Sequence, residues 1–361
     1  MGVHDTGEQA VKQQNNDYAA RLWQYKQAET ISLMIHVGRR LGLYNHMAGQ
    51  GPMSAAELSK KSGLHERWVL EWLRLQAAGK ILNYVVEGER FELPEAGVAL
   101  LGNDKSSSYM LENFDGGTPK EAIDALLESF RTGLGSTYES SGPEGALRGE
   151  SRHWKAARNQ VVPKMIPALD GVEEKLQNGC LVADVGCGDG AVILALAESF
   201  PNSTFYAYDP NKHAVARVKE VALEMGLSNV EVHRSSGEEI PASGKFDLVL
   251  TFDCIHDMTH PDIVISKIRE IIKEDGTWFI KDIRSKPRFE DNLRNPMLAM
   301  MYGFSLMSCM SSAMSAEGGA GLGTLGFNPE VAEEMSRAAG FTRFQMHDFK
   351  DPGNLYYEVR P

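Results

Sequence analysis

The sequence predicts an α/β protein in which a parallel sheet, with helices on both faces, follows a smaller α+β domain. Three observations support this fold class. Strand-like and helix-like segments alternate from Cys180 to the end of the chain, and a glycine-rich loop follows the first of those strands. The length of 361 residues also exceeds the roughly 100–200 of one ordinary domain. We therefore expect two domains with additional chain between them.

The N-terminal region has the element order of a winged helix. A helix is expected over 17–47, and Ser54 with Glu57 has the spacing of a capping box at the start of a short second helix. A third helix over 64–82 and a hairpin turning at Gly88 complete the order. The apolar residues expected on buried helix faces include Leu22, Tyr25, Trp68, Trp72 and Leu73.

Winged helices often bind DNA, but the helix over 64–82 has a weakly basic character. It contains three cations (Arg67, Arg74, Lys80) and two anions (Glu66, Glu71), a net charge of +1, whereas a DNA reader usually offers a denser basic face. The whole chain has 37 Lys and Arg against 49 Asp and Glu, a formal net charge of −12. Such a balance disfavours nucleic acids and anionic membranes. We expect this domain to dimerise or to cover a substrate, with DNA binding as the alternative.

The cysteines favour a reducing cytoplasm, and the apolar segments do not indicate a membrane protein. Four cysteines show no paired spacing, which favours a reducing cytoplasm over a disulfide framework. The N-terminus lacks a signal peptide's apolar run; Gly2 and Thr6 match a myristoylation pattern, but no basic cluster follows as a second anchor. Residues 295–316 carry no charge, yet serines, a proline and a glycine dilute their apolarity. We expect a helical element buried inside the protein there and no membrane span.

The alternation after Cys180 gives seven expected strands. They lie at 181–186, 203–209, 230–235, 246–252, 277–283, 342–349 and 354–360. Helices are expected up to Phe200, over about 211–226 and after Pro261. In such a sheet, ligands bind at the carboxyl ends of the strands.

The most specific motif is the loop that follows the first strand. That strand ends in Asp184, and Gly186, Gly188 and Gly190 come next, directly before a helix. Glycines let a ligand approach the backbone closely. The second strand ends in Asp209, nineteen residues after Gly190, where a carboxylate binds ribose hydroxyls. The spacing is GxGxG, and Ala191 stands where the dinucleotide-binding fingerprint has its last glycine. Because alanine is tolerated at that position, a nicotinamide-dependent oxidoreductase is an alternative.

These two motifs, DVGCGDG and YAYDP, resemble the first two motifs of class I S-adenosylmethionine-dependent methyltransferases, and the resemblance continues over 178–361. It implies a Rossmann-like, mostly parallel sheet with an antiparallel last strand and S-adenosylmethionine as cofactor. Ser236 stands where that family usually has an aspartate. The cofactor-binding residues implied are Asp184, Gly186, Gly188, Gly190, Asp209, Pro210, Ser236, Gly237, Glu238, Phe252 and Asp253.

The winged-helix half, the segment NPMLAMMYGFSLMSCM and the stretch GGAGLGTLG are together similar to a subgroup with an N-terminal winged helix, known from mycobacteria and widespread elsewhere. The domains expected are a winged helix over 1–105, a helical connector over 106–177 that contributes to the active site, and a cofactor-binding domain over 178–361. The last of these contains a helical lid insertion over 286–327. A homodimer is compatible with this organisation.

His256 is the candidate catalytic residue. The stretch IHDM resembles the HDW stretch that holds the catalytic base of small-molecule O-methyltransferases. A hydroxyl acceptor must lose a proton, and histidine suits that task. The alternative is a structural histidine that packs under the cofactor. We expect methyl transfer to a hydroxyl of a small molecule; a thiol or another small-molecule acceptor, and a cofactor-sensing DNA-binding regulator, stay open.

A metal site is the other interpretation of this stretch. His256, Asp257 and His260 include two histidines four residues apart. Pro261, however, is expected to open the next helix and to leave these residues in a loop. We therefore expect no metal.

Methionines are concentrated before the last two strands. Six of the chain's sixteen lie at 297, 300, 301, 307, 310 and 314. Flexible thioethers adapt to varied apolar ligands, so we expect Met301 and Tyr302, together with Tyr138 from the connector, to line the acceptor pocket. The alternative is a buried helix that packs on the other domain or a dimer partner. The glycines of 318–326 are expected to form a hinge for this cover.

Overall fold

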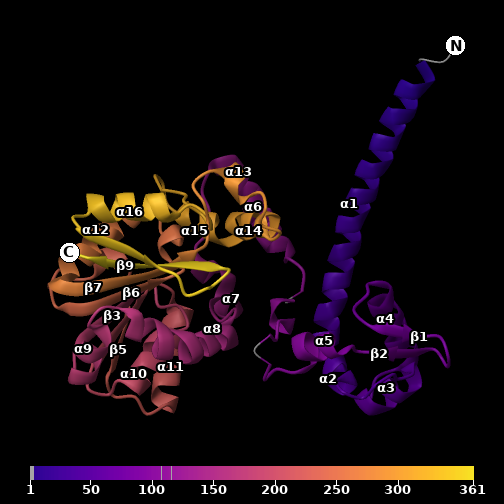
Figure 1. Ribbon diagram of the computed structural model, residues 1–361, viewed down its shortest axis with the longest axis horizontal. Coiled ribbons are helices and arrows are strands. Elements are labelled where there is room, and N and C mark those ends of the chain that lie inside the picture. Colours follow the sequence, from indigo (N-terminus) through magenta and orange to yellow (C-terminus); the bar gives the residue numbers. More distant parts are fainter. Residues whose placement is uncertain (1–3, 107, 115) are drawn as a thin grey trace. The chain divides into compact units, whose positions relative to one another are not determined.

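The computed structural model describes residues 4–106, 108–114 and 116–361. The chain forms two compact units, 1–118 and 119–361, coloured from indigo to magenta and from magenta to yellow in Figure 1. Gly2, which matches the myristoylation pattern, lies outside the described residues. Along the part of the chain that the structure describes, no helix is long and apolar enough to cross a membrane.

The N-terminal unit contains the predicted winged helix. Its elements are α1 (His4–Arg40), α2 (Leu43–Met47), α3 (Ala55–Ser62), α4 (Glu66–Ala78), β1 (Asn83–Val85), β2 (Arg90–Glu92) and α5 (Glu95–Gly97). Both hydrogen bonds of the expected capping box are present: Glu57 N–H donates to Ser54 Oγ at 3.2 Å, and Ser54 N–H donates to Glu57 Oε2 at 2.7 Å. The strands β1 and β2 pair antiparallel on either side of Gly88.

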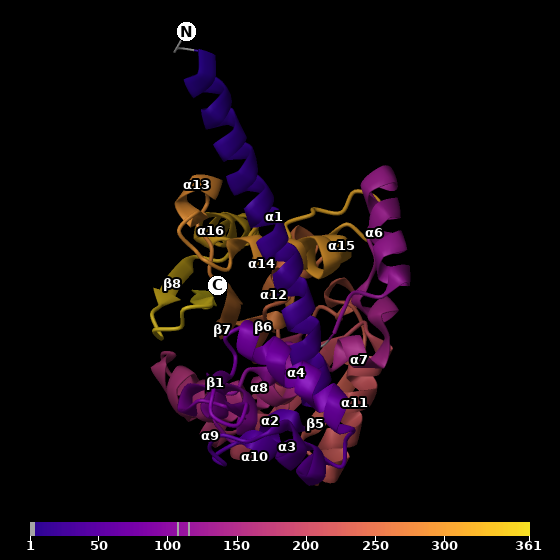
Figure 2. The same cartoon turned by 90° about the vertical axis from the view of Figure 1, so that its right-hand side faces the viewer.

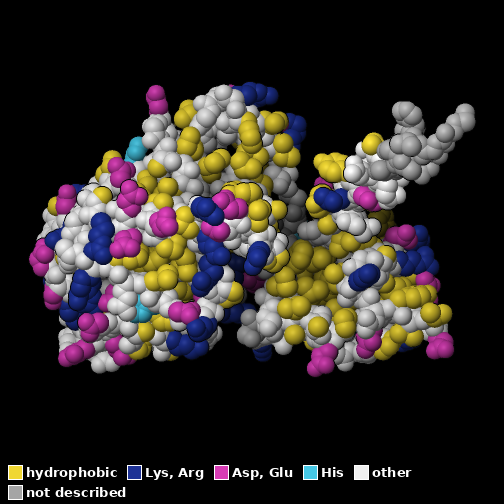
Figure 3. Space-filling model, turned by 45° about the horizontal axis from the view of Figure 1, so that its top comes forward, with side chains coloured by type: hydrophobic (Ala, Val, Ile, Leu, Met, Phe, Trp, Pro, Cys, Tyr) yellow, Lys and Arg dark blue, Asp and Glu magenta, His cyan; other side chains and the backbone are white. Residues whose placement is uncertain are grey.

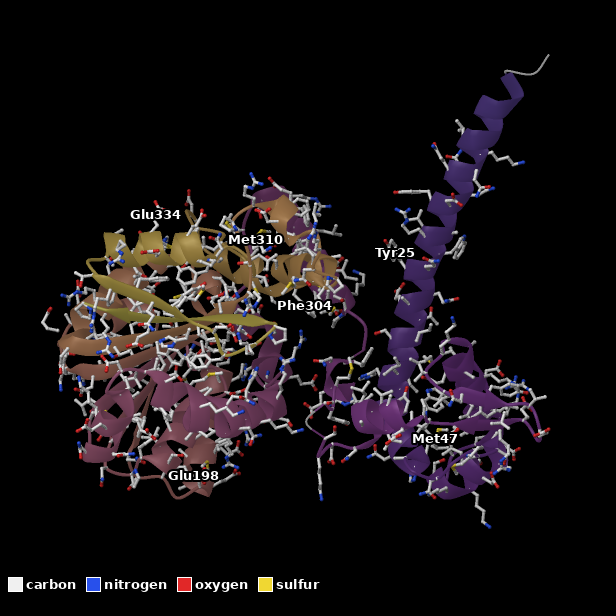
Figure 4. The ribbon with its side chains drawn as sticks, in the orientation of Figure 1. Tyr25, Met47, Glu198, Phe304, Met310 and Glu334 are labelled. Carbon is white, nitrogen blue, oxygen red and sulfur yellow. The ribbon has the colours of Figure 1, made fainter. Side chains whose placement is uncertain are left out.

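Three of the residues expected on buried faces are exposed instead. The first helix begins at His4, well before residue 17, and every side chain over 11–30 is exposed, including Leu22 and Tyr25. Figure 4 shows Tyr25 on a stretch of α1 that no other element of its unit covers. Trp68 on α4 is 79% exposed because Val69, Trp72, Leu73 and Gln76 form the buried face, and Trp68 lies outside that stripe.

The second unit is built on a seven-stranded sheet of order β5-β4-β3-β6-β7-β9-β8. The strands are β3 (Leu181–Val185), β4 (Thr204–Asp209), β5 (Val230–Arg234), β6 (Phe246–Phe252), β7 (Ile272–Ile283), β8 (Arg343–His347) and β9 (Asn354–Arg360). The first five strands run parallel to one another, whereas β9 pairs antiparallel with both β7 and β8. The predicted mostly parallel sheet with an antiparallel last strand is therefore confirmed.

Helices cover both faces of this sheet (Figure 1). On one face lie α9 (Val172–Asn178), α10 (Ala191–Ser199) and α11 (Lys212–Glu224), and on the other lie α12 (Pro261–Ile271) and α16 (Pro329–Ala338). Neighbouring strand residues alternate between the two layers: Val182 packs in the first core, and Ala183 in the second. Pro261 is the first residue of α12, as the sequence predicts.

The connector and the insertion are joined by hydrogen bonds. The connector holds α6 (Lys120–Thr132), α7 (Gly142–Ala146) and α8 (Glu150–Ala156), and the insertion holds α13 (Phe289–Asn292), α14 (Leu298–Phe304), a π-helical segment (Ser305–Cys309) and α15 (Met310–Ala313). Gly135 N–H donates to Met314 O at 2.9 Å, and Ser136 N–H donates to Ser311 Oγ at 2.8 Å. A Cβ at Gly135 would lie 1.9 Å from Ser311 O, so the two segments meet backbone to backbone. The helix α6 lies against the π-helical segment of the insertion, and Figure 2 shows α6 next to the part of the insertion labelled α15.

The expectation that 295–316 is buried is only half right. Leu298, Ser305, Ser311 and Ala313 are buried, but the other side of the segment is exposed. The exposed large side chains there are Met297, Met300, Tyr302, Phe304 and Met307. Figure 3 shows hydrophobic side chains at the surface of both units, and Figure 4 labels Phe304 and Met310 on the insertion. The segment consists of short helices, and only one side of it packs on the second unit.

Candidate active site

The glycine loop is packed at both ends and open in the middle. Gly186, Gly188 and Gly190 all have positive φ, at 77°, 54° and 76°, a conformation in which any other residue is strained. A Cβ at Gly186 would lie 2.8 Å from Cys254 Cβ, and one at Gly190 would lie 2.6 Å from Val218. A Cβ at Gly188 would meet nothing within 4 Å. The backbone at Gly188 therefore offers a ligand direct access.

Asp209 holds this loop in place. Its Oδ2 accepts a hydrogen bond from Gly188 N–H at 2.9 Å, and its Oδ1 accepts one from Asn211 N–H at 2.8 Å. Burial raises the pKa of Asp209 above its ordinary range, although these two hydrogen bonds oppose the shift. Each carboxylate oxygen has a second lone pair, so Asp209 keeps acceptor capacity for ribose hydroxyls.

Asp184, at the end of β3, is the most perturbed acid of this loop. It is 3% exposed, and burial, together with the charges of Asp209 and Asp189, raises its pKa to about 8. Cys187 and Cys254 lie beside it, and burial raises the pKa of both thiols well above their usual range. Cys254 donates to Val185 O at 3.1 Å. These cysteines therefore pack as small apolar groups.

A cavity of about 420 Å³ lies at the ends of β4 and β5. Its lining consists of Pro210, Arg234, Ser235, Ser236 and Glu239. Ser236 caps the turn Gly237–Glu239, with its hydroxyl bonded to Glu239 N–H. The Ser236 side chain is thus engaged in the turn, and Gly237 is buried against Val264 and Val185. Glu238, in the same turn, is half-buried.

The end of β6 lies on the other side of the loop. Phe252 packs edge-on against Phe279 with ring centres 5.4 Å apart. Asp253 has a φ of 52°, unusual for a residue with a side chain. Asn354 donates to its Oδ1 at 2.6 Å, and Lys281 forms an ion pair with its Oδ2. These contacts fix a strained residue beside the glycine loop, and such strain is concentrated at functional sites.

His256 lies in a buried acidic setting. It is part of the turn Ile255–Asp257, is 2% exposed, and donates from Nδ1 to Asp282 Oδ1 at 2.7 Å. Its Nε2 lies 3.3 Å from Asp257 Oδ1. Burial alone would lower the pKa of His256, but the charges of Asp282 and Asp257 outweigh burial and raise this pKa well above its ordinary value. For the two carboxyls, Asp257 and Asp282, burial has the opposite effect and raises the pKa.

Two further side chains join this cluster, and two predicted ones do not. Tyr138 O–H lies 3.7 Å from Cys309 Sγ, and burial together with Asp257 raises the pKa of Tyr138 well above its usual value. Tyr302 packs against Phe289, with ring centres 5.9 Å apart, and Met301 Sδ accepts from Asn295 Nδ2 at 3.3 Å. Among the described residues, no hydrogen bond, ion pair or ring contact links Met301 or Tyr302 to His256.

Sequence reasoning missed four residues of this region. Asp282 carried a signal, because it is a charge within the apolar strand TWFIKDI. His153 Nδ1 lies 2.5 Å from Asp189 Oδ2, which connects α8 to the glycine loop, but nothing in the sequence pairs these two positions. Cys309 reaches the cluster only through the packing of the insertion. The glycines of 318–326 are also anchored: Gly323 N–H donates to His256 O at 3.2 Å, and Ala320 N–H donates to Thr259 O at 2.8 Å.

Family models match both parts of the chain. Residues 176–325 match a model described as a methyltransferase domain, and residues 29–103 match one described as an Rv2258c-like winged HTH domain. The first match contains the glycine loop, Asp209, His256, Asp282 and Cys309, whereas Tyr138 precedes the matched residues. The chain therefore has a methyltransferase domain preceded by a winged helix-turn-helix domain.

Known proteins with similar sequences include plant N-methyltransferases. The chain is 28% identical over 112 residues to (S)-coclaurine N-methyltransferase of Thalictrum flavum subsp. glaucum, a match that covers 31% of each chain. It is 24% identical over 112 residues to (S)-tetrahydroprotoberberine N-methyltransferase of Eschscholzia californica, with 31% of this chain and 32% of the relative covered. The chain thus spans about a third of the length of these plant relatives.

Solved structures match over nearly the whole chain. A putative O-methyltransferase from Nostoc punctiforme superposes with a TM-score of 0.73 at 18% identity, covering 95% of this chain and 98% of that one. A mitomycin 7-O-methyltransferase superposes with a TM-score of 0.67 at 17% identity, covering 99% of both chains. Fold and family models together place the protein in the class I methyltransferase fold with an N-terminal winged helix.

Proposed function

We propose that this protein transfers a methyl group from S-adenosylmethionine to a hydroxyl oxygen of a small-molecule acceptor. The observation that carries this proposal is the juxtaposition of two features on neighbouring strands. The open backbone at Gly188 follows β3, and the His256–Asp282 pair lies at the ends of β6 and β7. A nucleotide-type site and a proton acceptor at the same edge of a sheet are what methyl transfer to a hydroxyl requires.

The glycine loop suits this cofactor. Gly186 and Gly188 admit its methionine end, Asp184 supports the loop, and Asp209 binds the ribose. The cavity lined by Pro210 and Ser236 has room for the adenine ring. Ser236 is engaged in its own turn, so recognition of the adenine falls to the backbone around Gly237 or to Glu238. Phe252 and Asp253 face the amino-acid end.

His256 takes the acceptor's proton. Bound S-adenosylmethionine supplies a methyl group carried on a sulfonium sulfur. The leaving group is a neutral thioether, so its departure needs no general acid. As the carbon–oxygen bond forms, the hydroxyl proton moves to Nε2 of His256, while Asp282 fixes the ring through Nδ1. The same carboxylates favour the protonated ring. Only the neutral ring accepts a proton, so turnover rises with pH.

The walls of the acceptor site come from the connector and the insertion. Tyr138 is in place beside Asp257 and Cys309. Met301 and Tyr302 complete the pocket when the insertion contacts an acceptor. The exposed methionines and aromatic rings of the insertion favour a partly apolar acceptor.

The names of the plant relatives support a nitrogen acceptor as the second candidate. A thiol is also acceptable, because a thiolate needs little help from a base.

A DNA-binding regulator is less well supported. On α4, Arg67 is paired with Glu71, and Arg74 is paired with Glu89 from the hairpin. Paired cations give a duplex little to bind, and Trp68 at this surface is apolar.

Release of S-adenosylhomocysteine over a panel of phenols, amines, thiols and carboxylates tests the proposal. We expect turnover with phenols, together with cofactor binding by calorimetry. Cofactor binding with turnover of amines alone would replace oxygen by nitrogen. Absence of cofactor binding would overturn the function, and tight, salt-dependent binding to duplex DNA without turnover would favour the regulator.

We also propose a homodimer in a reducing compartment. The four cysteines are free thiols in the structure. The exposed stretch of α1 carries Tyr18, Leu22, Trp23 and Tyr25, and an isolated helix of this kind gains most of its stability from packing. Light scattering should give twice the chain mass. The variant Leu22→Glu with Trp23→Glu should reduce it to the monomer mass, and a monomeric parent protein would contradict the proposal.

A further inference from the structure

Three metal-ligating side chains converge beside the proposed acceptor site. A ring nitrogen of His256, a carboxylate oxygen of Asp257 and Cys309 Sγ all lie within 4.8 Å of one another. They come from two segments far apart in the sequence, the turn Ile255–Asp257 and the π-helical segment Ser305–Cys309. Nitrogen, oxygen and sulfur ligands of this kind are the set that proteins use for Zn²⁺.

The ring of His256 is oriented as in a metal ligand. Its Nδ1 donates to Asp282 Oδ1 at 2.7 Å, and the ring is almost fully buried. Histidines that bind metals almost always donate the other ring N–H to a carboxylate or carbonyl, which fixes the ring and directs the free nitrogen to the ion. Here the other nitrogen, Nε2, is directed toward Asp257, and Cys309 lies in the same cluster.

The carboxylate of Asp257 is the second sign of a ligand. Its Oδ1 is buried and has no hydrogen-bond partner among the described residues. It lies 3.3 Å from His256 Nε2. Two ligand atoms that each stand about 2.0–2.1 Å from a tetrahedral ion are separated by about 3.3–3.4 Å, so this spacing fits one shared ion.

We propose that His256, Asp257 and Cys309 bind one Zn²⁺ ion, with the fourth position on the side of the Tyr138 hydroxyl. Two anionic ligands balance the charge of the ion, and three protein ligands leave one coordination position open. This site differs from the set considered from the sequence, because Cys309 replaces His260, which precedes α12 and is no part of the cluster. It also departs from our expectation that the protein binds no metal.

Zinc and proton transfer compete for one nitrogen. When His256 Nε2 is a ligand, it has no lone pair for the proton of a hydroxyl. If the proposed function holds, Zn²⁺ therefore inhibits methylation of hydroxyl acceptors, and a chelator reverses the inhibition. This consequence rests on the proposed function, but the binding site itself does not.

Titration of the chelator-treated full-length protein with Zn²⁺ and with Co²⁺ tests the site. Calorimetry should give one ion per chain, and the Co²⁺ form should show the near-ultraviolet band of thiolate-to-cobalt charge transfer. Cys309→Ser should abolish this band and weaken binding at least tenfold, and Asp257→Asn should weaken binding. Cys180→Ser and His260→Gln are the matched controls, which should keep both the band and the affinity.

Two results would overturn the site: no binding of either ion, or a band that persists in Cys309→Ser. Circular dichroism and thermal melting of the apo variants establish that each is folded, and Cys309→Ser is nearly isosteric. The two proposals fail separately. Zinc binding without any methyl transfer contradicts only the function, and methyl transfer without zinc binding contradicts only the metal site.

Discussion

The two ends of the candidate active site are built in different ways. The proposed cofactor end consists of Gly186, Gly188 and Gly190 with Asp209, whose carboxylate accepts a hydrogen bond from Gly188 N–H, and it lies within one strand–loop–helix–strand unit. The acceptor end takes Tyr138, His256, Asp282 and Cys309 from four separate segments. A site fixed by local backbone geometry tolerates little change at one position, whereas a site assembled by packing depends on several segments staying together.

The largest expected effect lies at the acceptor end. His256→Ala should lower turnover of an accepted hydroxyl compound about 10²–10⁴-fold, because the proton acceptor is lost. Cofactor affinity should change little, since the cofactor end does not depend on this ring. Turnover at saturating cofactor, measured beside His260→Ala as a control outside the cluster, checks this. Turnover within a few-fold of the parent protein would assign His256 a structural role.

The next effect lies at the cofactor end. Asp209→Ala removes both the proposed ribose acceptor and the partner of Gly188 N–H. We expect cofactor affinity to fall about 10–100-fold, which corresponds to about 1.4–2.8 kcal/mol. Calorimetry measures this loss of cofactor affinity. Asp247→Asn alters a buried carboxylate at the opposite end of β6, paired with Lys273, and should leave the affinity unchanged. Equal losses in both variants would point to general destabilisation.

Two alanine substitutions compare the packed and open parts of the glycine loop. Both Gly186→Ala and Gly188→Ala place a side chain on a left-handed backbone, which should lower the free energy of unfolding by about 1–2 kcal/mol. Gly186→Ala should cost more in the free energy of unfolding, because its Cβ would lie 2.8 Å from Cys254. Gly188→Ala should instead weaken cofactor binding, since its Cβ enters open space. Urea unfolding and calorimetry separate the two, and identical behaviour would contradict the open face.

Per pH unit, the smallest expected effect concerns the pH dependence of stability. Asp184 has a folded-state pKa of about 8 against an ordinary value of 3.8, so the folded protein binds more protons than the unfolded chain between these values. Stability therefore falls as pH rises through this window, by at most about 1.4 kcal/mol per pH unit from this group. Asp184→Asn should flatten the profile between pH 5 and 8 in urea unfolding. An unchanged slope would show that Asp184 is ionised in the folded state.

The same contrast explains how far the sequence could predict the molecule. The capping box of Ser54 and Glu57, the glycine loop and the helix start at Pro261 depend on neighbours in the chain, and the structure has them as predicted. Leu22 and Trp68 were expected on buried faces, because a periodic pattern does not reveal which helix face finds a partner. The cluster around His256 combines residues more than 100 positions apart, so only packing shows it.

The contact between Gly135 and Ser311 has a consequence for engineering acceptor specificity. Because a side chain at 135 would collide with the carbonyl oxygen of Ser311, the loop before Tyr138 and the insertion carry matched surfaces. An insertion transplanted from a related enzyme would meet a loop shaped for a different partner. Chimeras that aim to change the acceptor therefore need to exchange residues 133–141 and 286–327 as a pair.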